Sequence, residues 1–171
     1  LQQFKDDFDK NVSVFKAVPE FCQKYPRYER MGLRDLCEQI HGMYKANDVA
    51  RLTTEMYLSD MLPAMKPSDA FAAMAHREID RVEIDHLEGR ITSVLLTPYP
   101  PGIPLLIPGE RFNATIVGFL KFAREFNRRF PGFAADIHGL VEEETEGGTR
   151  YFVDCVRQSE AAVVPIAAAG R

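Results

Sequence analysis

The sequence predicts an α+β domain, in which N-terminal helices are followed by a small, mostly antiparallel sheet packed against helices. Three observations carry this prediction. Apolar residues in the first 75 positions recur with helical spacing. After Ile79 the pattern changes to the polar and apolar alternation of half-buried strands. Residues 97–110 then hold five of the eleven prolines, a composition that excludes a helix there.

Three helices are predicted in the N-terminal half. Gly32 and Asn47 bracket the first, whose apolar stripe consists of Leu33, Leu36, Cys37, Ile40 and Tyr44. A second helix begins after Asp48 and ends at Pro63, because proline stops a helix. The third begins at Pro67. Its expected buried residues are Ala70, Phe71, Met74 and Ala75.

The second half predicts strands and one long helix. Residues 81–85 and 91–96 are expected to be strands joined by a turn at Glu88-Gly89, and residues 104–107 an edge strand. Asn113 is expected to cap a helix that Pro131-Gly132 ends. The buried stripe of that helix is Ile116, Phe119, Leu120, Ala123 and Phe126.

A final hairpin is predicted to run from residues 140–142 through Gly147-Gly148 to residues 151–156. The expected division of the chain is a helical lead-in over residues 1–30, an α+β domain over 31–157 and a flexible, alanine-rich tail over 158–171.

The proline segment, residues 97–110, is the most informative stretch of the chain. Proline fixes φ and removes a backbone donor, so the segment is stiff, and Gly102 is the natural position for a positive φ. Unlike a polar linker, the segment contains four large aliphatic residues and is expected to be buried. These residues are Ile103, Leu105, Leu106 and Ile107.

Composition narrows the classes of function. A net charge of −4 and a pI near 5.6 argue against general nucleic-acid binding, which needs a basic face. No apolar run approaches the roughly 20 residues that cross a bilayer, and the polar start predicts no signal peptide. Three widely spaced cysteines favour a reducing cytoplasm. A first residue of Leu rather than Met indicates a piece of a longer protein.

No complete catalytic motif is present. His41, His76 and His86 are expected to be packing or surface residues. His138 stands two residues after Asp136, which could orient its imidazole, although a loop with polar side chains bonded to its own backbone is the plainer interpretation. The acidic run at residues 142–146 indicates a solvated hairpin.

The segment Glu88-Gly89-Arg90 allows two interpretations. Arg90 could reach a carboxylate of a partner chain, whereas a structural ion pair within the domain is the plainer expectation. The spacings of zinc ligands, a nucleophile elbow and phosphate-binding loops are all missing from the sequence.

Five short segments together resemble the C-terminal domain of bacterial ornithine/lysine/arginine decarboxylases, and most of all the lysine-acting members. They are residues 88–91 (Glu-Gly-Arg-Ile), 98–104 (Pro-Tyr-Pro-Pro-Gly-Ile-Pro), 108–110 (Pro-Gly-Glu), 130–133 (Phe-Pro-Gly-Phe) and 136–139 (Asp-Ile-His-Gly). The similarity covers roughly residues 8–156, and the combination of the second and third segments is specific.

The resemblance implies a function that this chain cannot perform alone. Such enzymes bind pyridoxal phosphate in a large upstream domain through the lysine of a Ser-x-His-Lys motif, and no histidine here is followed by lysine. The parent enzyme would convert lysine to the diamine cadaverine and CO2, or secondly would decarboxylate arginine. Each turnover would consume a proton, in keeping with an acid-stress role.

The resemblance also implies the place of this domain in the enzyme. We expect it to contact the upstream domain, to contribute to a homodimer and higher homo-oligomer, and to wall the substrate channel, without membrane or nucleic-acid partners. The expected channel residues are Tyr99, Pro100, Pro101, Gly102 and Glu110. A carboxylate at position 110 would attract a dibasic substrate.

Two further expectations follow. Some lysine-acting members bind a guanosine alarmone through a Leu-Arg-x-x-Asn stretch, whereas Val12, Ser13 and Lys16 stand at the similar positions here, so that regulation is not expected. The alternative function is a non-catalytic interaction domain that retains the decarboxylase fold. Its exposed edge at residues 151–156 would accept a partner strand.

Overall fold

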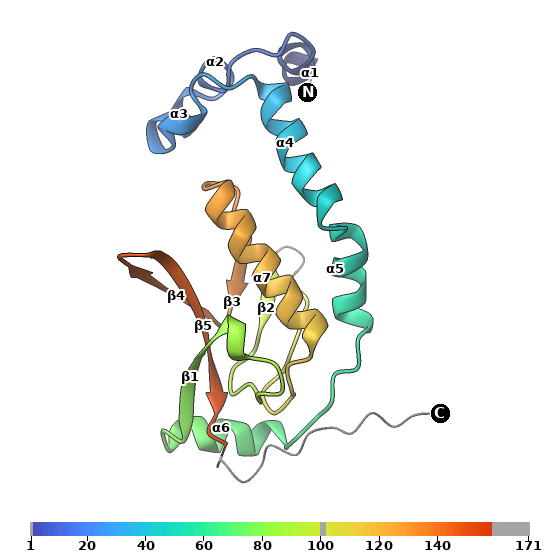
Figure 1. Cartoon of the computed structure of the whole chain (residues 1–171), viewed down its shortest axis with the longest axis vertical. Coiled ribbons are helices and arrows are strands. Elements are labelled where there is room, and N and C mark those ends of the chain that lie inside the picture. The colour runs from blue at the N-terminus through green and yellow to red at the C-terminus, as the bar shows by residue number, and fades with distance from the viewer. Residues whose placement is uncertain (1, 100–101, 159–171) are drawn as a thin grey trace. The chain divides into compact units, whose positions relative to one another are not determined.

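The computed structural model describes residues 2–99 and 102–158, and these form two compact units (Figure 1). The described residues of Leu1–Glu55 and Phe122–Ala134 make up the first unit, and those of Met56–Lys121 and Ala135–Arg171 make up the second. The predicted tail lies outside the described residues apart from Gln158, and so do Pro100 and Pro101.

The first unit is helical. Its helices are α1 (Gln2–Asp9), α2 (Val14–Ala17), α3 (Pro19–Lys24), the 3-10 turn η1 (Pro26–Tyr28), α4 (Leu33–Ala46), the first part of α5 (Val49–Leu58) and the last part of α7 (Ala114–Arg129). Their buried core consists of Val14, Cys22, Tyr28, Leu36, Met43, Phe126 and Phe130. The Tyr28 hydroxyl donates to the carbonyl of Pro131, 3.0 Å away, which ties the end of α7 to this core.

Helix α4 has the predicted bounds, with Gly32 before it and Asn47 after it, but its N-cap is supplied from a distance. The Asn11 Oδ1 accepts hydrogen bonds from the backbone N–H groups of Arg34 (3.0 Å) and Asp35 (3.3 Å). A Cβ on Gly32 would lie 2.1 Å from the same oxygen, so glycine is needed for this side chain to reach the helix. The sequence analysis missed this cap, since 23 residues separate Asn11 from Arg34.

Helix α5 ends at Leu58, so the prediction that it continues to Pro63 was wrong. The physical reason lies in the residues that follow it. The Ser59 hydroxyl donates to the Met56 carbonyl, and the amide of Asn113 donates to the Ser59 hydroxyl (2.9 Å) and to the Asp60 carbonyl (3.2 Å). These bonds divert the chain before the proline is reached.

The second unit contains two antiparallel sheets and α6 (Pro67–Ala75). The larger has the strand order β1 (Ile79–Glu83), β5 (Gly148–Val156), β4 (Leu140–Thr145), and the smaller pairs β2 (Thr97–Tyr99) with β3 (Asp136–His138). A further 3-10 turn, η2 (Ile84–His86), follows β1. The first half of α7 is part of this unit, and the predicted stripe from Ile116 to Phe126 is buried. The predicted α+β class is therefore confirmed.

Helix α6 packs on the larger sheet through small residues. Ala70 is buried with Ile91 and Val156, and Figure 1 shows α6 across the ends of β1 and β5. Phe71 is 61% exposed and Ala75 is exposed as well, so the expectation that they are buried was wrong. The next residue along a helix points about 100° away, so the face that holds Ala70 and Ala73 meets the sheet and Phe71 does not.

The predicted strand over residues 91–96 was also wrong, although Ile91 and Leu96 at its two ends are buried. Ile91, Thr92 and Leu96 make only isolated bridges, to Arg111, Cys155 and Leu106 respectively. The Thr92 hydroxyl donates to the Val94 carbonyl (2.7 Å) and accepts from the Val94 N–H (3.1 Å). This local bonding bends the backbone and competes with a continuous ladder.

Two further strand predictions need correction. Residues 104–107 do not form an edge strand, because Pro104 cannot donate and the one bridge there is made by Leu106. Residues 151–156 belong to β5, which pairs with β1 on one side and with β4 on the other, so they are not an exposed edge. Strand β1 begins at Ile79, two residues before the predicted start.

Candidate functional site

The proline segment lies beside the Asp-Ile-His-Gly segment. Thr97 pairs with His138, Pro98 with Ile137 and Tyr99 with Asp136 in the antiparallel β2–β3 ladder. The interpretation of residues 136–139 as a loop was therefore wrong. Two segments that carry the family resemblance and are distant in the sequence form one small sheet.

Gly102 is hydrogen-bonded back to β2 and lies beside Tyr99. The N–H of Gly102 donates to the Pro98 carbonyl, 2.8 Å away, and Gly102 has the predicted positive φ of 79°. A Cβ on Gly102 would stand 3.0 Å from Cε1 of Tyr99, so the tyrosine ring lies directly over the glycine. Tyr99 itself is 50% exposed.

One face of the β2–β3 sheet presents polar side chains. Directly paired residues of an antiparallel ladder share a face, so the exposed Tyr99, Asp136 and His138 lie on the same side. Ile137 on the opposite face is 5% exposed. Within the described part of the chain no group of three His, Cys, Asp or Glu residues could hold a metal ion.

Glu110 holds the far end of the proline segment in place. Its Oε2 accepts a hydrogen bond from the Ile107 N–H (2.8 Å), and its backbone carbonyl accepts one from Thr92 (3.0 Å). Neighbouring Gly109 has a φ of 93° and touches the backbone of Met65. The Pro-Gly-Glu segment is therefore a fixed turn that joins three parts of the unit.

Burial of the proline segment was predicted only half correctly. Leu105 and Leu106 are at most 1% exposed, whereas Ile103 and Ile107 are 54% and 40% exposed. The exposed apolar strip of this region consists of Leu95, Tyr99, Ile103 and Ile107. The Tyr57 hydroxyl donates to the Ile103 carbonyl over 3.4 Å, which supports the strip from α5.

The Glu88-Gly89-Arg90 segment makes both a turn and a structural ion pair, as the plainer expectation had it. Gly89 has a φ of 79°. Arg90 Nη2 lies 2.8 Å from Asp80 Oδ2, and Arg157 Nε lies 3.2 Å from the other oxygen of the same carboxylate. Hydrogen bonding to Arg90, and then to Arg157, holds the pKa of Asp80 below its usual value.

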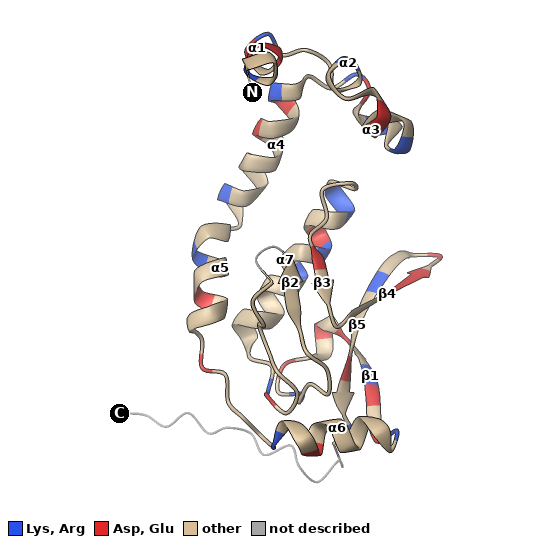
Figure 2. Cartoon of the chain, turned by 180° about the vertical axis from the view of Figure 1, so that it is seen from behind, with Lys and Arg blue, Asp and Glu red and all other residues tan. Residues whose placement is uncertain are grey.

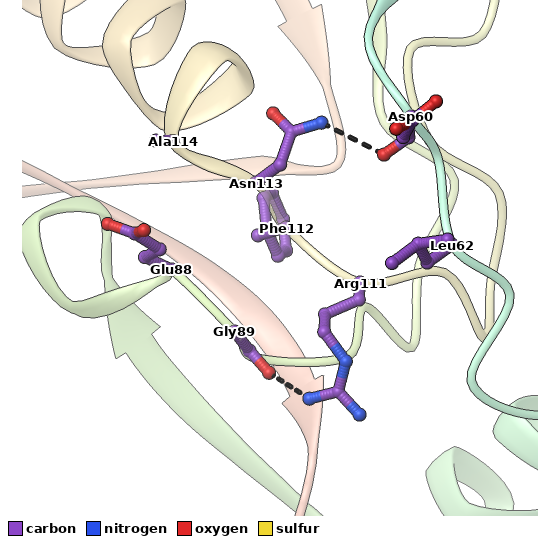
Figure 3. A pocket seen from close by; sticks show the side chains of 8 residues that line it. All are labelled: Asp60, Leu62, Glu88, Gly89, Arg111, Phe112, Asn113 and Ala114. Carbon is purple, nitrogen blue, oxygen red and sulfur yellow. Dashed lines mark hydrogen bonds between the residues drawn. The ribbon is translucent and has the colours of Figure 1, made fainter. Parts of the chain in front are cut away.

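A pocket of about 210 Å³ lies between Glu88-Gly89 and the start of α7 (Figure 3). The sequence analysis singled out only Glu88, Gly89 and Asn113 of its lining. The complete lining is Asp60, Leu62, Glu88, Gly89, Arg111, Phe112, Asn113 and Ala114. No motif in the sequence indicates the other five, since the pocket forms where three distant segments meet.

The acidic hairpin is solvated, as predicted. Glu142, Glu143 and Glu144 are exposed on β4, and Figure 2 shows acidic residues along this hairpin. The pKa of Glu142 is raised, first by partial desolvation and then by Glu144 and Asp136. Glu143 pairs with Arg81 over 3.3 Å.

Residues 50–157 match the family model described as the C-terminal domain of Orn/Lys/Arg decarboxylases. This chain belongs to that family. The matched region contains all of the β strands, the proline segment and the pocket of Figure 3, so the decarboxylase C-terminal domain is the context in which each of them is to be understood.

Among individual relatives, the decarboxylase domain is 41% identical over 162 residues to lysine decarboxylase LdcA of Pseudomonas aeruginosa, covering 92% of this chain and 22% of that protein. It is 33% identical over 165 residues to the biodegradative arginine decarboxylase of Escherichia coli, covering 92% of this chain and 21% of that protein. The chain thus spans about a fifth of the length of the curated relatives it matches.

Comparison with solved structures also finds decarboxylases of this family. Lysine decarboxylase A from Pseudomonas aeruginosa superposes with a TM-score of 0.86 at 43% identity, and the constitutive lysine decarboxylase of Escherichia coli with 0.82 at 29% identity. Each alignment covers 92% of this chain and 22% of the other.

The described residues do not fit pyridoxal phosphate. No lysine lines the pocket of Figure 3. A second pocket, of about 400 Å³ in the helical unit, is lined by Lys45, but this lysine is exposed on the last turn of α4. A cofactor lysine requires a desolvated amine and a phosphate-binding loop, and neither accompanies Lys45 within the described chain. No described helix is both long and apolar enough to span a membrane.

Proposed function

We propose that this domain is the C-terminal part of a pyridoxal-phosphate-dependent decarboxylase that converts lysine to cadaverine and CO2, with arginine as the second substrate. The observation that carries the proposal is the 41% identity to a lysine decarboxylase, against 33% to an arginine decarboxylase. In this proposal the cofactor is bound by an upstream domain. The protein acts in the cytoplasm, where the free thiols of Cys22, Cys37 and Cys155 stay reduced.

The role we propose for this domain is to wall the substrate channel and to build the homo-oligomer. The strip of Leu95, Tyr99, Ile103 and Ile107 supports this role, because four exposed large apolar side chains fall within residues 95–107 and grouped exposed apolar side chains mark interaction surfaces. We propose that the strip meets the upstream domain, with Tyr99, Pro100, Pro101 and Gly102 at the channel. The hydrogen bond from the Gly102 N–H to the Pro98 carbonyl would help to hold the Tyr99 ring in a fixed position.

Glu110 is proposed to act near the channel mouth by its charge. One carboxylate oxygen is engaged by the Ile107 N–H, which fixes the side chain and leaves the second oxygen for a cation. A negative charge held at the entrance raises the local concentration of a doubly cationic substrate. A replacement by glutamine keeps an oxygen that can accept the Ile107 bond and removes only the charge.

The test uses the full-length protein and measures CO2 release from lysine, arginine and ornithine. We expect lysine to have the highest kcat/KM. Tyr99→Ala should lower kcat/KM for lysine about tenfold, equivalent to roughly 1.4 kcal/mol of transition-state stabilisation. Phe71→Ala, which truncates another exposed aromatic residue of the same unit, is the control and should change little.

Glu110→Gln should raise KM for lysine several-fold with kcat nearly unchanged, and the effect should shrink as salt is added. A preference for arginine or ornithine would overturn the substrate assignment. Equal activities of the Tyr99 and Phe71 variants would overturn the channel assignment.

A further inference from the structure

The pocket between Glu88-Gly89 and α7 contains three charged side chains that are not neutralised within the described chain. Asp60 and Glu88 have no ion-pair partner there, and the Arg111 guanidinium donates from Nη1 to the Gly89 carbonyl and not to a carboxylate (Figure 3). Four other arginines of the same unit, Arg81, Arg90, Arg150 and Arg157, each contact a carboxylate. The lining of the pocket therefore includes charged residues of both signs that do not pair with each other.

The walls of this pocket are held by backbone hydrogen bonds. The Gly89 N–H donates to the Phe112 carbonyl (2.9 Å), the Phe112 N–H to the Arg90 carbonyl (2.9 Å), and the Arg111 N–H to the Leu62 carbonyl (3.1 Å). These bonds connect three segments that are distant in the sequence. The pocket is therefore a feature of the folded backbone and does not depend on one side-chain rotamer.

The side chains that line the pocket indicate the kind of ligand that it could bind. Phe112, 2% exposed, and Leu62 provide apolar surface, while Asp60 and Glu88 stand on opposite sides of the space in Figure 3. Arg111 supplies the positive charge. The start of α7 at Ala114 adds the positive end of a 16-residue helix dipole.

We propose that this pocket binds a free dibasic amino acid. One guanidinium and two carboxylates complement one α-carboxylate and two ammonium groups, and the apolar surface matches the methylene chain between them. A volume of about 210 Å³ admits a small metabolite and is below the roughly 300–1,000 Å³ of sites for drug-sized ligands. Only the choice of lysine as the probe rests on the proposed function.

The experiment titrates L-lysine into the 171-residue chain without pyridoxal phosphate and follows binding by calorimetry and by amide chemical shifts. We expect saturable binding at one site per chain, with shifts at Glu88, Gly89 and Arg111. Cadaverine lacks the carboxylate and L-norleucine lacks the second ammonium, so each should bind about tenfold more weakly. Binding of cadaverine as tight as that of lysine would overturn the assignment of Arg111.

Variants distinguish binding of lysine at this pocket from nonspecific attraction of a cation to an acidic protein. Asp60→Asn and Glu88→Gln should each weaken lysine binding about fivefold. Neither carboxylate has a partner whose loss would unfold the described chain. Glu78→Gln removes the same charge from an exposed position outside the pocket and should leave binding unchanged.

Absence of saturable binding up to about 10 mM lysine would overturn the proposal. It would mean that the free energy of binding is weaker than roughly 3 kcal/mol. So would equal effects of the pocket and control variants. The titration involves no turnover, so its failure would leave the proposed decarboxylase function untouched. Failure of the full-length protein to decarboxylate lysine would, conversely, leave the titration result standing.

Discussion

Gly109 lies in a crowded turn against the backbone of Met65, and a side chain is not expected to fit there. It has a φ of 93°, and a Cβ placed there would lie 2.5 Å from the Met65 carbonyl oxygen and 3.2 Å from its carbonyl carbon. Both are backbone atoms, so a rotamer change cannot relieve the contact. The Gly109 carbonyl also accepts the N–H groups of Ala64 (2.9 Å) and Met65 (3.2 Å), which must move if Met65 moves.

The cost of Gly109→Ala can be estimated from these contacts. A side chain at this φ costs about 1–3 kcal/mol. Weakening two backbone hydrogen bonds adds about 1 kcal/mol each. We therefore expect Gly109→Ala to lower the free energy of unfolding by about 3–5 kcal/mol.

The assay is urea unfolding followed by circular dichroism, with the midpoint and the m-value fitted together. Gly118→Ala is the matched control, because a Cβ there meets nothing within 4 Å. In a helix interior this change should add about 0.5–1 kcal/mol. A Gly109→Ala protein within 1 kcal/mol of the wild type would show that the Met65 backbone does not crowd this position.

Three further predictions concern stability. Thr97 is 2% exposed, and its hydroxyl has no hydrogen-bond partner among the described residues. Thr97→Val should therefore raise the melting temperature and the free energy of unfolding, the latter by about 1 kcal/mol. A lower free energy of unfolding would mean that the hydroxyl is hydrogen-bonded. Asn11→Ala removes the cap of α4 and should cost about 1 kcal/mol, seen as faster amide exchange at Arg34 and Asp35; unchanged exchange there would argue against the cap. The pKa of Asp80 is lowered, so its contribution is present above the unfolded pKa near 3.8 and is lost as the pH falls through the folded value. Asp80→Asn should therefore cost about 0.5 kcal/mol at pH 7, since the side chain is 39% exposed, and the difference in urea unfolding should close as the pH falls through the lowered pKa of Asp80; a constant difference would contradict the sign.

Local signals in the sequence predicted much of the fold. The bounds of α4, the Asn113 cap of α7 and the β4–β5 hairpin depend on residues close together in the chain, and all three are present. The predicted α4 stripe is correct only in part, since Tyr44 is 40% exposed and Met43 is buried instead. Asn113 Oδ1 accepts the Ile116 N–H over 2.9 Å, the geometry expected of an N-cap. Predictions of this kind succeed because the interaction is contained in one turn or one helix.

The errors arose where distant contacts override local preference. The β-branched run from Ile91 has strand propensity, yet bonds from Thr92 and Ser93 direct it away from a ladder. The pocket that contains Arg111 was missed because it joins segments about 25 residues apart, which no periodicity reveals. The predictions for two glycines were correct, because Gly89 and Gly102 have the positive φ that a turn requires.

We propose that this domain is part of a lysine decarboxylase whose chemistry is carried by another part of the protein. The most direct measurement compares CO2 release from lysine, with pyridoxal phosphate added, by the 171-residue chain and by the full-length protein. We expect release by the full-length protein and none by the chain, which should also show no absorbance of a lysine-bound cofactor. Release of CO2 by the chain alone would mean that this domain carries the chemistry itself.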